Sequence, residues 1–227
     1  SSNEERFMTW RTTDGTGEAK TAQSQLEVLI KGMCRFDVIL DLIRHFILFQ
    51  DDGENIIKIM AAYHQYYAVK MAVQETKRAV ATNGDQKIGV VWHTQGSGKS
   101  LSMVFYAGEL IQELDNPTIV VVTDRNDLDE QLFKTFGKSV ELLRQTPKQA
   151  ENREDLRDLL RVQSGGVIFT TMQKFSLEDN ETQMSALTER RNVIVIADEA
   201  HRSQYGFSGR INYDNGENDT KYGYAKY

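Results

Sequence analysis

The sequence lacks features that would mark several other classes of protein. Its single cysteine, Cys34, excludes an internal disulfide. It has no signal peptide and no apolar run of about eighteen residues, so we expect a cytoplasmic protein without a membrane partner. Its four histidines have no cysteines at zinc-binding spacing, which argues against a zinc site. The net charge of −6 excludes a general polyanion binder, so any contact with DNA must be confined to a local groove.

A glycine-spaced loop follows a short apolar run at residues 90–92, and a helical pattern follows the loop. Glycines allow consecutive backbone N–H groups to wrap a phosphate, and the positive end of the next helix faces the same charge. The loop ends in a lysine, whose charge can bind the β- and γ-phosphates, and a serine, whose hydroxyl can bind Mg²⁺. The pattern therefore predicts an ATP phosphate loop, made of Thr94, Gln95, Gly96, Ser97, Gly98, Lys99 and Ser100.

This loop departs from the general phosphate-loop pattern at one position. The pattern G-x-x-x-x-G-K-[ST] has glycine where this chain has His93. A glycine-rich surface turn is the alternative interpretation. We favour the phosphate loop because the apolar run before it fits the first strand of a core, entered by a turn at residues 82–85, and an amphipathic helix follows it.

A second polar cluster, Asp198-Glu199-Ala200-His201, follows the apolar run 193–197. Such a run is typical of a parallel strand buried on both faces, and ligands of doubly wound sheets bind at the carboxyl ends of strands. We expect Asp198 to hold Mg²⁺ through its water shell and Glu199 to orient or deprotonate the attacking water. His201 would couple hydrolysis to movement of a neighbouring lobe. The alternatives are a solvated acidic strand end and an ordinary loop histidine.

Hydrophobic periodicity predicts an α/β lobe with a parallel sheet, preceded by a small helical segment. Residues 1–20 form an N-terminal segment that Trp10 anchors. The expected helices are 22–33, 36–48, 57–81, 127–136 and 148–162. Besides the run before the phosphate loop, the expected strands are 118–122, 167–171 and 193–197. We expect two domains, with residues 1–50 as an entry segment and helical linker and 51–227 as a RecA-like lobe.

Four separate sequence motifs carry a resemblance to a known family. They are Tyr63-His64-Gln65-Tyr66, residues 92–100, residues 121–128 and residues 198–204. Together they resemble the motor (R) subunit of type I restriction-modification enzymes, a DEAH-type translocase of helicase superfamily 2. His93 is similar to what that family carries. The resemblance implies ATP-driven translocation of double-stranded DNA, with Mg²⁺ as cofactor and methylase (M) and specificity (S) subunits as partners, before endonucleolytic cleavage.

The resemblance also implies roles for residues outside the phosphate loop. Gln65 would read the adenine edge, a task that suits an amide because it both donates and accepts. Thr123 and Arg125 would bond DNA phosphates, and Thr171, with Thr170, is a weaker candidate. The alternatives are a surface glutamine at position 65 and a purely structural loop in which Asn126 caps the next helix.

Two features of type I motor subunits are missing from the sequence: a nuclease motif and the part of the motor that begins with motif III. The matches to the nuclease pattern Glu-x-Lys, at residues 18–20 and 75–77, are interpreted as chance. Residues 205–227 have no apolar run, so we expect the chain to end before motif III and to be nearly inactive in isolation. The alternatives to a restriction motor are another superfamily 2 DNA translocase and a non-motor P-loop enzyme such as a kinase; a purely structural module is least favoured.

Overall fold

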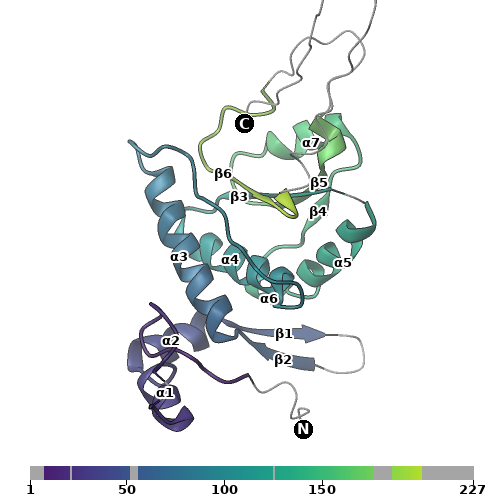
Figure 1. Ribbon diagram of the computed structural model, residues 1–227. Helices are drawn as coiled ribbons and strands as arrows, with labels where there is room; N and C mark the ends of the chain where they lie inside the picture. The colour runs from purple at the N-terminus through teal and green to yellow at the C-terminus, as the bar shows by residue number, and fades with distance from the viewer. Residues whose placement is uncertain (1–7, 21, 52–55, 125, 176–185, 201–227) are drawn as a thin grey trace, which may run out of the picture. The chain divides into compact units, whose positions relative to one another are not determined.

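The computed structural model describes residues 8–20, 22–51, 56–124, 126–175 and 186–200 of the 227-residue chain (Figure 1). The chain divides into two compact units. The first, which we call the loop unit, comprises Ser1–Asp115 and Thr135–Gln145. The second, the sheet unit, comprises Asn116–Lys134 and Thr146–Tyr227. No helix in the described ranges is both long enough and apolar enough to cross a membrane.

The loop unit is built mainly from helices. Its elements are α1 (Gln25–Lys31), α2 (Phe36–His45), β1 (Ile47–Asp51), β2 (Ile56–Met60), α3 (Tyr63–Val80), α4 (Lys99–Glu113) and α6 (Val140–Leu143). Phe46, fully buried after the end of α2, packs against Tyr66 of α3 and Phe105 of α4, with ring centroids 4.8 and 5.6 Å apart. These aromatic contacts join three helices around one core.

The hairpin β1–β2 replaces parts of two predicted helices (Figure 1). The prediction of helix over 36–48 is wrong after His45, and that over 57–81 is wrong before Tyr63. The strands pair antiparallel, with Ile47 opposite Met60. β-Branched residues on both sides of the polar stretch 51–54 favour a hairpin over helix, and the burial of β2 alternates along the strand.

The predicted anchor at Trp10 is confirmed. Its side chain is 4% exposed and lies among three tyrosines of α3, Tyr63, Tyr66 and Tyr67, with centroids 6.3, 6.0 and 6.0 Å away. Trp10 therefore holds the otherwise polar N-terminal segment on the loop unit.

The predicted first core strand before the phosphate loop is absent from the described structure. Residues 87–94 have no regular secondary structure, and Val90 and Trp92 are 86% and 88% exposed. Gly89 has a φ of +126°, which lies outside the extended region that a strand needs. The apolar composition of this run suggested a strand, but its backbone turns away from that conformation.

The sheet unit contains a four-stranded parallel sheet in the order β4-β5-β3-β6. Its elements are β3 (Thr118–Thr123), α5 (Asn126–Gly137, most of which belongs to this unit), β4 (Lys148–Gln149), α7 (Arg153–Leu160), β5 (Val167–Thr171), the 3-10 helix η2 (Met172–Phe175) and β6 (Val193–Ala197). The predicted α/β lobe with a parallel sheet flanked by helices is confirmed, and strands β3, β5 and β6 lie where the apolar runs placed them. The predicted helix 148–162 is wrong at its start, because Asn152 caps α7 by accepting from the Asp155 amide at 2.9 Å.

The two faces of this sheet are covered by different helices. Val120 and Val122 of β3 and Ile168 of β5 pack with Leu156 and Leu160 of α7. Phe169, the next residue of β5, points to the other face, where it meets Phe133 of α5 with centroids 5.2 Å apart.

Burial on both faces holds for β3 and β5 but is wrong for β6. Every residue of β3 and β5 is buried, whereas Val195 in β6 is 48% exposed. In the described part of the chain β6 stands at the edge of the sheet, so its side chains have fewer neighbours than those of β3.

Candidate functional site

The predicted phosphate loop has the backbone that its glycines permit. Gly96 and Gly98 adopt φ values of +81° and +79°, and Gly98 is the N-cap of α4. Lys99 and Ser100 are therefore the first two residues of that helix, where backbone N–H groups have no partner within the helix and favour an anion. Residues 94–96 are exposed, so the rim of this loop is open to a ligand.

Two successive residues of α3 hold the end of this loop. His64 Nε2 lies 3.0 Å from the Ser97 carbonyl oxygen, and Gln65 Nε2 donates to the Gly98 carbonyl at 3.0 Å. The Gln65 oxygen accepts from the Ala62 amide at 2.9 Å, which caps the start of α3. A Cβ at position 98 would come within 2.6 Å of Gln65 Nε2 and displace that amide from its bond, and the positive φ independently favours glycine there. Gln65 is 5% exposed, and its role in reading adenine stays a prediction.

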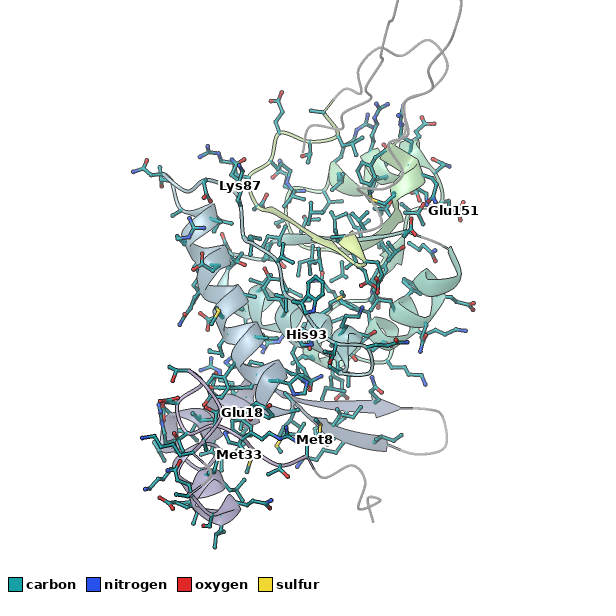
Figure 2. The ribbon with its side chains drawn as sticks, in the orientation of Figure 1. Met8, Glu18, Met33, Lys87, His93 and Glu151 are labelled. Carbon is teal, nitrogen blue, oxygen red and sulfur yellow. The ribbon has the colours of Figure 1, made fainter. Side chains whose placement is uncertain are left out.

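His93, which is labelled in Figure 2, precedes the phosphate loop in the chain and contacts it. Its Nδ1 atom lies 3.1 Å from the Ser97 hydroxyl, and that hydroxyl donates to the Thr94 carbonyl at 2.7 Å. The rings of His64 and His93 are 5.9 Å apart. Burial lowers the pKa of His93, and the nearby His64 and Lys99 lower it further, so the neutral imidazole is favoured at neutral pH.

A partly buried ionic cluster joins α3 to α2 and α4. Lys70 Nζ lies 2.6 Å from Glu109 and 3.0 Å from Asp41, and Tyr66 donates to Asp41 at 2.9 Å. The Glu109 side chain is 1% exposed; burial raises the pKa of its carboxyl although Lys70 opposes the rise. Burial alone would lower the pKa of Lys70, but its bonds to Glu109 and Asp41 raise it. This cluster fixes the register of α3 along α4, the helix that begins at the phosphate loop.

In the sheet unit, Asp198 and Glu199 stand at the carboxyl end of β6, as predicted. The Asp198 amide donates to the Val122 carbonyl of β3 at 2.9 Å, which continues the sheet by one residue. Asp198 Oδ1 accepts from the Glu199 amide at 2.9 Å, and Glu199 has a φ of +49°. A non-glycine residue in the left-handed region is uncommon and is often found at functional sites. Ligands of open α/β sheets bind at this end of the strands.

The three threonines among the predicted DNA-contacting residues lie at the same end of the sheet, but their side chains are buried. Thr123, Thr170 and Thr171 are 2%, 0% and 3% exposed. Gln173 of η2 donates to the Asp124 carbonyl at 2.9 Å and so ties the loop after β3 to η2. The structure thus presents no exposed threonine hydroxyl for a phosphate there. Arg125 and His201 lie outside the described residues.

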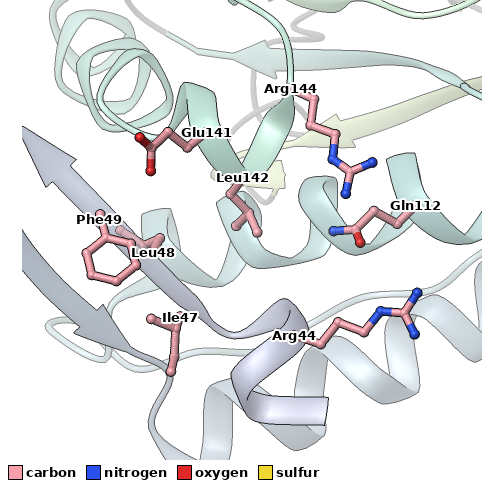
Figure 3. A pocket seen from close by; sticks show the side chains of 8 residues that line it. All are labelled: Arg44, Ile47, Leu48, Phe49, Gln112, Glu141, Leu142 and Arg144. Carbon is pink, nitrogen blue, oxygen red and sulfur yellow. The ribbon is translucent and has the colours of Figure 1, made fainter. Parts of the chain in front are cut away.

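The loop unit also has a groove that the sequence did not indicate (Figure 3). Its volume is about 250 Å³, and it is lined by Arg44, Ile47, Leu48, Phe49, Gln112, Glu141, Leu142 and Arg144. Figure 3 shows the side chains of Arg44, Gln112 and Arg144 on one side of it and Glu141 on the other. None of the predicted site residues lines this groove, so the predicted chemistry does not depend on it.

Sequence reasoning missed the parts played by His64, Lys70 and Glu109. His64 precedes Gln65 in the sequence motif 63–66, and that adjacency is the signal that could have indicated its contact with Ser97. Lys70 and Glu109 are 39 positions apart and lie on different helices. No local pattern reports such a pair.

Comparisons with known proteins identify the family of this chain. A family model described as SWI2/SNF2 ATPase matches residues 64–221. The endonuclease subunit of the type I restriction enzyme HindI from Haemophilus influenzae is 51% identical over 98% of this chain and 21% of its own length. A putative type I restriction enzyme endonuclease subunit, MjaIXP, from Methanocaldococcus jannaschii is 39% identical over 81% of this chain and 17% of its own. The chain thus spans about a fifth of the length of the curated relatives that it matches.

Proposed function

This chain belongs to the SWI2/SNF2 ATPase family and is similar to endonuclease subunits of type I restriction enzymes, and from that premise we propose that it is the first ATP-binding lobe of a double-stranded DNA translocase. The observation that carries this proposal is the phosphate loop. Left-handed glycines at positions 96 and 98 lead into a helix that begins with Lys99 and Ser100. Membership of an ATPase family implies that the nucleotide is ATP.

The proposed roles follow from the chemistry of each residue. Backbone N–H groups of residues 94–98 and the start of α4 would hold the phosphates, and Lys99 would neutralise the β- and γ-phosphates. We assign Mg²⁺ to oxygen donors by their chemistry, with Ser100 as a hydroxyl ligand and Asp198 as a carboxylate acting through water. When bound, the ion would neutralise charge that develops on the transferred phosphoryl group. Glu199 would orient or deprotonate the attacking water, and His201 would couple hydrolysis to motion of a neighbouring lobe.

The DNA-facing part of the proposal rests on the relatives, whose names describe endonuclease subunits of type I restriction enzymes. We assign double-stranded DNA as the track and methylase and specificity subunits as partners, in the cytoplasm. Residues 1–50 would then form the linker on the nuclease side, and residues 51–227 the motor lobe. Arg125 would supply one phosphate contact; Thr123 and Thr171 would contribute only if their buried hydroxyls become exposed in the complex.

A second candidate is a superfamily 2 translocase outside restriction. The description of the matching family model, SWI2/SNF2 ATPase, names no restriction activity, and this favours the second candidate. The identity of 51% to a restriction subunit across nearly the whole chain favours the restriction motor. A non-motor P-loop enzyme, such as a kinase, would not need the glutamate that follows Asp198.

Two substitutions in the full-length subunit test the assigned roles. Lys99→Ala should lose ATP affinity and hydrolysis together, because the lysine contacts the phosphates before and during reaction. Glu199→Gln should keep ATP affinity but lower the rate of hydrolysis by about a hundredfold or more, because an amide cannot accept the proton of water. Equilibrium nucleotide binding and steady-state DNA-dependent ATPase separate the two. Equal loss of ATP binding in both variants would overturn the role given to Glu199.

A further inference from the structure

His93 and His64 both reach one residue of the phosphate loop, Ser97. His93 Nδ1 lies 3.1 Å from the Ser97 hydroxyl, and His64 Nε2 lies 3.0 Å from the Ser97 carbonyl. The two contacts therefore hold the side chain and the backbone of the same residue. Ser97 lies between Gly96 and Gly98, the two residues of the loop with positive φ.

The donors in these contacts follow from counting hydrogens. The Ser97 hydroxyl carries one hydrogen, which it donates to the Thr94 carbonyl at 2.7 Å. The contact with His93 must then be an N–H of His93 donating to the Ser97 oxygen. A carbonyl only accepts, so His64 must donate from Nε2. The two imidazoles thus act as donors through opposite ring nitrogens, Nδ1 in His93 and Nε2 in His64.

The His93 contact is not available to the general phosphate-loop pattern, because that pattern has glycine at position 93, which has no side chain to donate. The His64 contact comes from α3, which lies outside that pattern. Glycines on both sides of Ser97 give the loop many conformations to lose on binding a nucleotide, and their ordering opposes binding. A donor on each side of Ser97 removes part of that freedom before the nucleotide arrives, which strengthens binding.

The position of His64 is fixed by the rest of α3. Gln65, its neighbour, bonds both the Gly98 carbonyl and the Ala62 amide. Lys70, further along the helix, is held by Glu109 and Asp41. The His64 ring also meets the Tyr63 ring edge-on, with centroids 5.4 Å apart. The histidine on α3 is therefore a rigid reference for the loop.

We propose that His64 and His93 are positioning residues of the phosphate loop, which hold Ser97 from two sides and set the loop in a shape that accepts a triphosphate. This inference rests on the proposed function, since it assigns the loop to ATP. Neither histidine touches the reacting atoms in this scheme. Their loss should weaken nucleotide binding and leave the hydrolysis of bound nucleotide nearly unchanged.

Pairs of substitutions with matched shape provide the test in the full-length subunit. His93→Asn keeps an N–H donor near the place of Nδ1, whereas His93→Leu has a similar shape and no donor. His64→Gln and His64→Met form the same kind of pair for Nε2. The dissociation constant of the fluorescent nucleotide mant-ATP, together with KM and kcat of the DNA-dependent ATPase, is measured for all four variants and for Lys99→Ala.

We expect each variant without a donor to bind mant-ATP about fivefold more weakly, the loss of one net hydrogen bond. KM should rise in parallel and kcat should stay within about twofold, while His93→Asn and His64→Gln should stay close to the unaltered protein. Equal binding by the matched members of each pair would overturn the inference, as would a fall in kcat without a change in the dissociation constant. If Lys99→Ala leaves mant-ATP binding intact, the proposed function fails instead. Because the matched members differ in donor capacity rather than size, the pairs stay informative if either position is sensitive to volume.

Discussion

The two units of this chain hold their functional residues by different means. In the loop unit, the phosphate loop is held by the side chains of His64 and Gln65, on a helix that the Lys70 cluster ties to α2 and α4, and by the side chain of His93. In the sheet unit, Asp198 and Glu199 follow from the register of a buried sheet, which the Asp198 amide extends. Backbone pairing is encoded by apolar runs and is visible in a sequence. A scaffold of polar side chains depends on partners distant in the chain.

The largest expected effect is in the loop unit, at the ionic cluster. Lys70→Met leaves the Glu109 carboxylate, 1% exposed, without its cation, and we expect a loss of about 3 kcal/mol in local unfolding free energy. The matched control is Lys77→Met, on the same helix, because Lys77 pairs with Glu113 at a site where the two side chains are 45% and 36% exposed. That change should cost less than about 1 kcal/mol. Hydrogen exchange of α3 and α4 amides in rising denaturant measures both.

The double variant Lys70→Met/Glu109→Leu sharpens this test. Replacing both charges by apolar groups removes the uncompensated carboxylate, so most of the lost stability should return. Similar costs for Lys70→Met and Lys77→Met would mean that the cluster is not the scaffold of the loop unit.

A second prediction compares the two kinds of apolar run directly. Val121 in β3 is fully buried and Val90 before the phosphate loop is 86% exposed. Val121→Ala should cost about 2 kcal/mol, because it removes two buried carbon groups and leaves a cavity, and Val90→Ala should change stability by less than about 0.5 kcal/mol. Hydrogen exchange measured in rising denaturant gives the change in unfolding free energy for each variant. If Val90→Ala costs as much as Val121→Ala, residues 90–92 are buried as the sequence predicted.

The fold could be predicted from the sequence where local pattern and final environment agree. The runs that became β3, β5 and β6 are β-branched and follow one another with helices between them, and all three strands lie where predicted. The run 90–92 has the same composition, yet Gly89 turns its backbone away from the extended region. The hairpin β1–β2 was missed because Ile47 and Ile57 also fit a helical period, and short apolar runs do not separate the two periods.

The candidate site likewise contains residues whose positions the sequence predicted and residues whose contacts it did not. The places of Lys99 and Ser100 at the start of α4, and of Asp198 and Glu199 after β6, could be predicted because they depend on fixed spacing from a glycine or from the end of a strand. Their chemical roles stay predictions. The tie between Lys70 and Glu109 could not, because it joins two helices that no sequence period relates. The burial of Thr123 and Thr171 was missed for a related reason: a residue at the end of a strand can point into the sheet or out of it.

The smallest expected effect is a dependence of the loop unit on pH. His45 is buried beside Asp41, Arg44, Lys70 and Glu113, and burial lowers its pKa although Asp41 opposes the shift. As pH falls below the ordinary histidine value of about 6.5, the unfolded chain takes up the proton first, so the unfolding free energy of the loop unit should fall.

His45→Gln should reduce the slope of α3 and α4 stability against pH between about pH 7 and 5, while His93 and the other groups still titrate. Hydrogen exchange of those amides at several pH values measures the slope. An unchanged slope would mean that burial of His45 does not set the acid sensitivity of the loop unit.

The central claim is that Lys99 belongs to a motor that moves along double-stranded DNA. The most direct measurement is displacement of a third strand from a triplex downstream on the DNA by the assembled enzyme, with DNA binding recorded in parallel. Lys58→Ala, at an exposed lysine of β2, is the matched control. The account predicts that Lys99→Ala stops displacement while DNA binding and the Lys58→Ala variant are unaffected. Displacement at the unaltered rate in the Lys99→Ala enzyme would contradict it.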